Sequence, residues 1–191
     1  MTEFLNYGKP TSFLVEVIPG DGDYDLVSYF YPGALPDAWG PGVAVKVTPP
    51  LGGEWIGYFL QGKEARSAID LCCIHPDGER LIVVAKGSGY VVSLSDPMKW
   101  EEIPFRPILG GRFDAESNTL VLFDYTRAFA INEQGYCWKT AHLSWDGLTE
   151  VEVRAGFLIG KGWDAASSEL VPFEVRLSDG SHVGGASPAI G

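Results

Sequence analysis

The feature of this sequence that most constrains its fold is a series of short apolar segments divided by tight-turn residues, clearest from Ile74 to Leu94 (IHPDGERLIVVAKGSGYVVSL). PDGE predicts a turn, because proline presets its own φ and glycine tolerates a positive φ. LIVVA is apolar throughout, which is typical of a strand buried on both faces. KGSG predicts a second turn and YVVSL a further strand. With the apolar segment AIDLCCIH before it, this stretch predicts a three-stranded meander.

The same order of strands and turns recurs in residues 110–140 (GGRFDAESNTLVLFDYTRAFAINEQGYCWKT) and, more weakly, in residues 158–180 (LIGKGWDAASSELVPFEVRLSDG). In each copy a large apolar residue followed by His or Asp precedes a turn, and a leucine opens the next strand seven residues after that apolar residue. The pairs are Ile74-His75, Phe113-Asp114 and Trp163-Asp164, and the leucines are Leu81, Leu120 and Leu170. Successive pairs lie 39 and 50 residues apart (74 to 113, 113 to 163), near the ~40–50 residues of a propeller blade.

These meanders, above all HPDGERLIVVAKGSGYVVSLSDP, resemble the repeats of WD-repeat and related β-propeller proteins over about residues 66–180. The resemblance implies a propeller-like fold and carries no catalytic residue to this chain. The sequence departs from the WD pattern, because no Gly-His pair and no closing Trp-Asp stands where such a repeat has them; Trp145-Asp146 and Trp163-Asp164 lie elsewhere. GYCWKTAHLSWDGL is also similar to a segment of uncharacterised bacterial and plant proteins, which implies no activity.

The predicted organisation is a single all-β domain over residues 1–191, built from propeller-like meanders. Residues 1–66 form an irregular N-terminal β region with possible strands at SFLVEVI, DLVSYFY, GVAVKV and EWIGYFL, residues 67–180 hold about three meanders, and residues 181–191 form a flexible tail. Pro172 marks its segment as an edge strand or a bulge. Closed propellers usually have four or more blades, so a small or incomplete propeller, a β-barrel and a sandwich all remain open.

The charge of the chain limits the classes of partner. The formal net charge is −11, with nine acidic and four basic residues in 1–70 and sixteen and ten in 71–191, so the excess is spread along the chain. A diffuse negative field repels phosphate backbones, which argues against nucleic-acid binding. The negative charge suits a basic protein partner, although most acidic proteins are acidic for solubility alone.

Cysteine use and hydropathy favour a cytoplasmic protein without a membrane segment. Cys72, Cys73 and Cys137 are odd in number and include an adjacent pair, which is no disulfide framework. The N-terminus lacks the order of a signal peptide, and no apolar run approaches the ~18 residues of a membrane helix. No metal-ligand spacing, phosphate loop or nucleophile motif is present, so no metal, cofactor or catalytic residue is predicted.

One polar and aromatic cluster could bind a ligand: Arg112, Asp114, Asp124, Arg127, Trp138, Trp145 and Asp146. Carboxylates beside aromatic rings are the ingredients of a sugar-binding or glycoside-cleaving cleft. The structural alternative is favoured, because Asp124 and Arg127 bracket a hairpin turn, where Asp commonly bonds the local backbone. Asp146-Gly147 is a natural turn pair. Likewise His75, which exchanges with Asp114 and Asp164 between copies, is expected to shape its turn.

A second candidate surface is the aromatic-rich N-terminal region, where rigid rings in Pro/Gly loops favour recognition. Its members are Tyr24, Tyr29, Phe30, Tyr31, Trp39, Trp55, Tyr58 and Phe59. Core filling of a β-sheet explains most of these aromatics equally well. The leading hypothesis is a non-enzymatic interaction module that binds a basic partner, in its specific form an immunity- or inhibitor-type protein. The alternative is a small-molecule or carbohydrate-binding or hydrolysing protein that uses the clustered Asp and Trp residues. The sequence leans against an enzyme and leaves the oligomeric state open.

Overall fold

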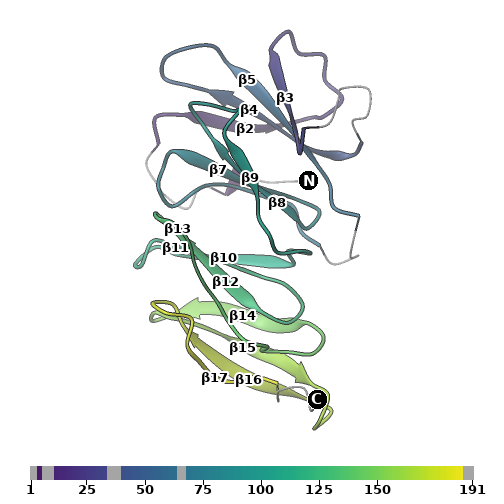
Figure 1. Cartoon of the computed structure of the whole chain (residues 1–191), viewed down its shortest axis with the longest axis vertical. Helices are drawn as coiled ribbons and strands as arrows, with labels where there is room; N and C mark the ends of the chain where they lie inside the picture. The colour runs from purple at the N-terminus through teal and green to yellow at the C-terminus, as the bar shows by residue number, and fades with distance from the viewer. Residues whose placement is uncertain (1–3, 6–10, 34–39, 64–67, 187–191) are drawn as a thin grey trace. The chain divides into compact units, whose positions relative to one another are not determined.

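The computed structural model describes residues 4–5, 11–33, 40–63 and 68–186 (Figure 1). Every helix-or-strand element in these residues is a β-strand, which confirms the predicted all-β class. The strands form three four-stranded sheets and one five-stranded sheet, and most neighbours in each sheet follow one another in the chain. The chain therefore has the propeller-like meander fold that the sequence predicts.

The chain divides into two compact units, residues 1–108 and 109–191, and each unit contains two of the sheets. In Figure 1 the first unit runs from purple to teal and the second from green to yellow. The single-domain organisation stays a prediction.

The first sheet of unit 1 has the order β2-β4-β5-β3. Its strands are β2 (Leu14–Ile18), β3 (Val27–Tyr31), β4 (Gly42–Thr48) and β5 (Trp55–Leu60). β2, β3 and β5 lie within the predicted N-terminal segments, and β4 extends one residue beyond its segment GVAVKV, to Thr48. β2, β4 and β5 are antiparallel neighbours, whereas β3 pairs with β5 in parallel. The region that the sequence presents as irregular is thus a regular sheet whose order differs from a simple meander.

The second sheet of unit 1 contains the meander predicted from Ile74 to Leu94. Its order is β1 (Phe4–Leu5), β6 (Leu71–Ile74), β7 (Arg80–Ala85), β8 (Ser88–Ser93) and β9 (Trp100–Glu102). β1 pairs in parallel with β6, and the other pairs are antiparallel. Residues 81–85 are buried, as the unbroken apolar run LIVVA predicts.

Unit 2 consists of two complete antiparallel meanders. The first contains β10 (Gly110–Asp114), β11 (Thr119–Phe123), β12 (Ala128–Asn132) and β13 (Gly135–Lys139). The second contains β14 (Leu148–Arg154), β15 (Phe157–Asp164), β16 (Glu169–Arg176) and β17 (His182–Gly184). β17 lies inside the segment predicted as a tail.

Pro172 lies on an inner strand, β16, and the pairing explains how the strand accommodates it. β15 pairs with β16 along its whole length, but β17 pairs only with residues 173–175. The proline precedes the β17 ladder and offers only its carbonyl on that side, to the amide of Gly185 (2.9 Å). Its missing N–H therefore costs no ladder hydrogen bond, the condition under which sheets tolerate proline.

In the third predicted copy, the turn that follows the Asp lies one strand later in its meander than in the other two copies. The turns at His75 and Asp114 join the first and second strands of their meanders, whereas the turn at Asp164 joins the second and third, β15 and β16. The matching elements are instead Leu94-Ser95-Asp96 after β8 and Leu177-Ser178-Asp179 after β16. Both follow the third strand of a meander, and they lie 83 residues apart (94 to 177).

An equivalent tryptophan joins the two sheets inside each unit. The indole Nε1 of Trp55 in β5 donates to the carbonyl oxygen of Leu94 (3.3 Å), and Nε1 of Trp138 in β13 donates to that of Leu177 (2.7 Å). Both rings are buried in the apolar core of their unit. The tryptophan and the turn in one unit thus correspond to those in the other at the same spacing of 83 residues, and each pair links the two sheets of its unit.

Candidate functional site

Four of the seven residues predicted as a ligand cluster lie in turns, and their hydrogen bonds stay local. Asp114 Oδ2 accepts from the amide and the hydroxyl of Ser117 (2.9 and 2.5 Å). Asp124 Oδ1 accepts from the amides of Thr126 and Arg127 (2.7 and 2.8 Å). The amide of Asp146 donates to the hydroxyl of Ser144 (3.2 Å). The contacts of Asp114 and Asp124 agree with the structural alternative, in which the Asp carboxylate shapes a turn, whereas at Asp146 the bonded group is the backbone amide.

The other three residues contact the sheets of unit 2. Arg112 donates through Nε to the carbonyl of Val151 (2.8 Å), and its guanidinium lies 5.9 Å from the centre of the Phe123 ring. Trp138 is buried with its indole N–H bonded, as described above. Trp145 is 38% exposed and meets the ring of His142 edge to face. A ligand role for the seven residues stays a prediction.

A hollow in unit 2 lies across one face of the sheet β14-β15-β16-β17 and measures about 550 Å³. We call it the acid-rimmed groove. Its main side chains are Glu150, Glu152, Ile159, Lys161, Glu174 and Val183. One row of cross-strand partners sets its centre: Ile159 in β15 stands opposite Glu152 in β14 and Glu174 in β16, and Glu174 stands opposite Val183 in β17.

Alternation along the strands separates this face from the core. Leu158 and Val175, the neighbours of Ile159 and Glu174, are fully buried, whereas Ile159 is half-buried and Glu174 exposed. Val183 is 68% exposed, a large fraction for an apolar side chain. Adjacent strands lie ~4.8 Å apart, so the Glu152 and Glu174 backbones stand roughly 10 Å apart, with Ile159 between them.

A bulge at the start of β14 completes the rim. The register shifts between Thr149 and Glu152, and Glu150 has a φ of +53°. This conformation brings the Glu150 carboxylate to Lys161 of β15, whose Nζ lies 2.8 and 2.9 Å from the two carboxylate oxygens. The only cation of the lining is thereby neutralised.

The electrostatics of the acid-rimmed groove follow from that pairing. Within the described residues, the carboxylates of Glu152 and Glu174 have no ion pair. The next cross-strand row holds Arg154, Phe157 and Arg176, and Arg176 lies 3.7 Å from Asp179. The groove thus presents two carboxylates without an ion pair to a described residue on either side of an apolar strip, and Arg154 in the next row likewise has no such ion pair.

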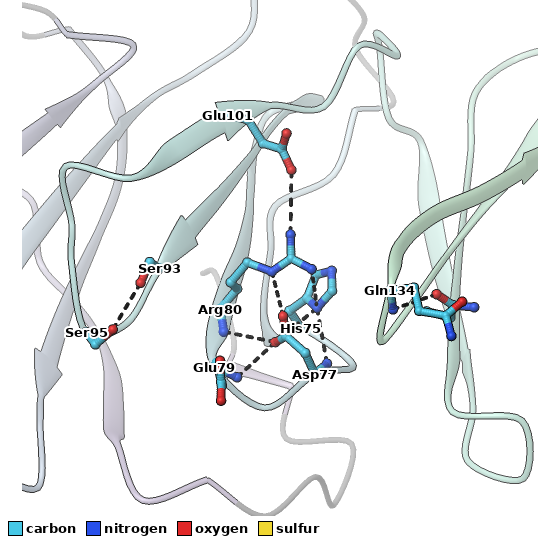
Figure 2. A network of polar contacts seen from close by, with 9 residues as sticks. His75, Asp77, Glu79, Arg80, Ser93, Ser95, Glu101 and Gln134 are labelled. Atoms are coloured by element: carbon cyan, nitrogen blue, oxygen red, sulfur yellow. Dashed lines mark hydrogen bonds and ion pairs between the residues drawn. The ribbon is translucent and has the colours of Figure 1, made fainter.

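His75 belongs to a buried turn network in unit 1 (Figure 2). Its Nδ1 accepts from the Asp77 amide (3.2 Å) and lies 3.4 Å from Arg80 Nη2. Arg80 Nε donates to Asp77 Oδ2 (2.6 Å), and Nη1 lies 3.7 Å from Glu101 of β9. Burial lowers the pKa of His75 to about 4, more than the nearby Asp77 carboxylate raises it. These bonds agree with the expected turn-shaping role.

The adjacent thiols of β6 are unsuited to nucleophilic chemistry. Cys72 and Cys73 are fully buried, and burial raises the pKa of the Cys73 thiol to about 12. Among the described residues, no three His, Cys, Asp or Glu side chains come together as a metal site.

The aromatic surface predicted in the N-terminal region is mostly core, with one open part. Tyr31, Trp55 and Phe59 are buried, and Tyr31 stacks on Phe59 at 4.7 Å between ring centres. Tyr29 and Trp55 line a hollow of about 420 Å³ beside the Pro49–Glu54 loop. Trp39 lies outside the described residues.

The sequence patterns predict none of the groove residues. EVEVR in β14 carries the alternation of a half-buried strand, and FLIGKGWD in β15 carries it less clearly because two glycines interrupt it. Period-two alternation is the signal that could have assigned Glu152 and Ile159 to an exposed face. It could not have joined them to Glu174, since that contact depends on the register between strands.

Comparisons with known proteins find likeness in structure alone. No protein-family model and no curated protein sequence matches the chain. One similar solved structure is a chain of the S. cerevisiae complex of a Dbp5 variant bound to Nup159, a Gle1 variant, IP6 and ADP (14% identity, TM-score 0.45). Another is the N-terminal domain of Nup159 (16% identity, TM-score 0.44). Each match covers 76% of this chain and 40% of the matched chain.

The described segments contain no helix with the length and apolarity needed to cross a bilayer.

Proposed function

We propose that this protein is a non-enzymatic interaction module that binds a basic, partly apolar segment of a partner protein in the acid-rimmed groove. The observation that carries the proposal is the row Glu152-Ile159-Glu174-Val183, where two unpaired carboxylates flank an apolar strip. An extended segment with alternating Lys or Arg and apolar side chains would match this row. Its cations would meet the carboxylates, and its apolar side chains would cover Ile159 and Val183.

The charge of the whole chain supports the same partner. At a net charge of −11, the field attracts a cationic partner over distances near the Debye length and speeds association. Complementary charge governs specificity and association rate more than final affinity. We therefore expect a salt-sensitive complex whose specificity depends on the groove.

The narrower form of the proposal is an immunity- or inhibitor-type role against a basic protein, exercised in the cytoplasm. The negative field supports the first part. The three cysteines, all free in the structure, support a reducing compartment.

The test uses a defined probe and a matched pair of variants. A fluorescein-labelled peptide of alternating Lys and Val, titrated with the full chain, should give saturable fluorescence polarisation that weakens as salt rises. Glu152→Gln/Glu174→Gln should weaken binding roughly fivefold, since each exposed ion pair contributes up to ~1 kcal/mol. Asp21→Asn/Asp23→Asn removes the same charge from two exposed acids of unit 1 and should change affinity less than twofold.

Two results would overturn the proposal. Equal weakening by both double variants would assign binding to net charge and remove the role of the groove. Affinity that does not change between 50 mM and 500 mM salt would exclude a basic partner, because exposed ion pairs are screened over that range.

A further inference from the structure

A pocket in unit 1 has a lining of opposite sign to the rest of the chain. It measures about 310 Å³ and forms where three segments meet: Leu60–Lys63 at and after the end of β5, Lys86–Ser88 at the β7–β8 turn and the start of β8, and Glu102–Pro107 at and after the end of β9. Three of its side chains are cationic and one is acidic, in a chain with eleven more acidic than basic residues. Composition alone does not lead one to expect such a lining.

The cations of this pocket stand out when the ion pairs of unit 1 are compared. Of the six Lys and Arg side chains that the structure describes in residues 1–108, four are ion-paired: Lys46–Glu54, Arg80–Asp77, Lys99–Asp96 and Arg106–Glu102. The other two, Lys63 and Lys86, have no ion pair with any described residue, and both line this pocket. Two ammonium groups without an ion pair to a described residue therefore line one concave site.

Ser88 adds a hydroxyl that no described residue engages. Its side chain is 7% exposed, yet its Oγ forms no hydrogen bond in the described part of the chain. Ser88 is one of the residues that line the pocket, so its hydroxyl is a candidate donor for a polar ligand there.

The turn that carries Lys86 is strained for its residue type. Lys86 and Gly87 have φ values of +41° and +82°, the left-handed pair of a type I′ hairpin. Asn or Gly is favoured at the first position, and a lysine there is held in a sparsely populated conformation. Gly62 permits the close approach of β5 to this turn, because a Cβ there would lie 2.5 Å from the Lys86 carbonyl oxygen. The fold therefore places the Lys86 cation at the pocket at a cost in backbone conformational energy.

We propose that this pocket binds the phosphate monoester group of a small molecule. A phosphate monoester carries a charge near −2 at neutral pH, which matches the two free ammonium groups of Lys63 and Lys86. Lysine binds phosphate as a point charge, and the Ser88 hydroxyl supplies a directed donor. Leu60, Tyr90 and Pro107 provide apolar walls for the rest of the ligand. The Tyr90 ring is fixed there, because its hydroxyl donates to the Leu60 carbonyl (2.8 Å).

The volume of the pocket favours a small metabolite over a macromolecule. A cavity of about 310 Å³ lies at the lower end of small-molecule sites. This site is separate from the acid-rimmed groove, so the two proposals stand or fall independently.

The experiment measures phenyl phosphate binding to the full chain by isothermal titration calorimetry and by ³¹P NMR line broadening. We expect saturable binding with a Kd on the order of 1 mM or below, and at least tenfold weaker binding of benzoate, a monoanion of similar shape. Ser88→Ala should weaken binding, because it removes the directed donor.

Lys86→Asn separates binding from folding. It removes the charge but places a favoured residue in the type I′ turn, so affinity should fall roughly tenfold while Tm rises by about 2–4 °C. Lys99→Ala is the control of equal charge, since Lys99 pairs with Asp96 outside the pocket; it should leave affinity unchanged.

Three results would overturn the proposal. The first is the absence of saturable phenyl phosphate binding. The second is equal weakening by Lys86→Asn and Lys99→Ala, which would reduce the effect to net charge. The third is tighter binding of a phosphoserine peptide than of phenyl phosphate, which would assign the site to a macromolecular partner.

Discussion

The buried histidine of the β6–β7 turn should make stability depend on pH in a defined window. His75 is 1% exposed, and its burial lowers its pKa to about 4 from the 6.5 of an unperturbed histidine. Between these values the unfolded chain binds a proton that the folded chain does not. Stability is therefore complete above about pH 6.5 and falls as the pH drops toward 4.

Linkage gives the size of the loss. A shift from 6.5 to about 4 corresponds to a loss of about 2 kcal/mol by pH 5 and about 3 kcal/mol by pH 4. The charged groups that face the ring are Asp77 and Arg80, with Glu101 beyond Arg80. Burial acts to raise the pKa of Asp77, but hydrogen bonds from the Glu79 amide and Arg80 outweigh it and the pKa is lowered. Asp77 therefore loses its stabilising effect only below pH 3.8, outside the histidine window.

Urea denaturation at pH 7.5, 6, 5 and 4.5 measures the effect, with hydrogen exchange in β7 assigning it to unit 1. His75→Asn is the reference, because its Oδ1 can accept from the Asp77 amide as Nδ1 does and it cannot titrate. The free energy of unfolding of the wild type should fall by about 2 kcal/mol more than that of the variant between pH 7.5 and 5. Parallel curves for the two proteins, or an NMR titration of the His75 ring centred near pH 6.5, would refute the reasoning.

Three further predictions concern packing and turns. Trp138→Phe should destabilise the protein by about 1–3 kcal/mol in urea denaturation, because it leaves the Leu177 carbonyl without its 2.7 Å donor; Trp55→Phe, which removes a longer bond of 3.3 Å, should cost less. Gly162→Ala should lower Tm strongly, since its Cβ would lie 2.0 Å from the Leu143 carbonyl oxygen, whereas Gly53→Ala meets no atom within 4 Å and should change the free energy of unfolding by less than about 0.5 kcal/mol. Asp164→Ala should lower the free energy of unfolding more than Asp114→Ala in the same assay. Both carboxylates accept hydrogen bonds from the amide and hydroxyl of a serine three residues later, but Asp164 is only 4% exposed and Asp114 is less deeply buried.

The strands of this chain can be predicted from its sequence because turn residues mark where each strand ends. The N-terminal strands β2, β3 and β5 fall within apolar segments that Gly- and Pro-rich loops bound, β4 extends one residue past its segment, and β7 falls on the run LIVVA. Proline and glycine fix or free φ locally, so their effect needs no knowledge of the rest of the fold. The sheet order β2-β4-β5-β3 cannot be predicted from turn residues, because the parallel pairing of β3 with β5 depends on contacts between distant segments.

The correspondence between the meanders is less easily predicted from sequence for a related reason. Asp114 and Asp164 make the same bonds to a serine three residues later, yet one turn follows the first strand of its meander and the other the second. A short turn of this kind is stabilised by its own side chains wherever it occurs, so its sequence does not indicate which strand of the meander it follows. The segments Leu94-Ser95-Asp96 and Leu177-Ser178-Asp179 align correctly because each leucine carbonyl also accepts from a tryptophan of the neighbouring sheet.

The predicted ligand cluster and the acid-rimmed groove also differ in this way: local sequence determines the turns of the cluster, whereas strand register determines the groove. Residues such as Asp124 attract attention in a sequence because acids and aromatics gather there, but a turn uses those residue types for its own backbone. The acid-rimmed groove instead depends on register: Glu152 and Glu174 flank Ile159 only because a bulge with Glu150 at positive φ shifts β14 against β15. A glutamate has no intrinsic preference for that conformation, so no local pattern predicts the bulge. Surfaces made by pairing between strands, rather than by turns, are therefore where a β-meander protein can carry a binding site that its sequence does not reveal.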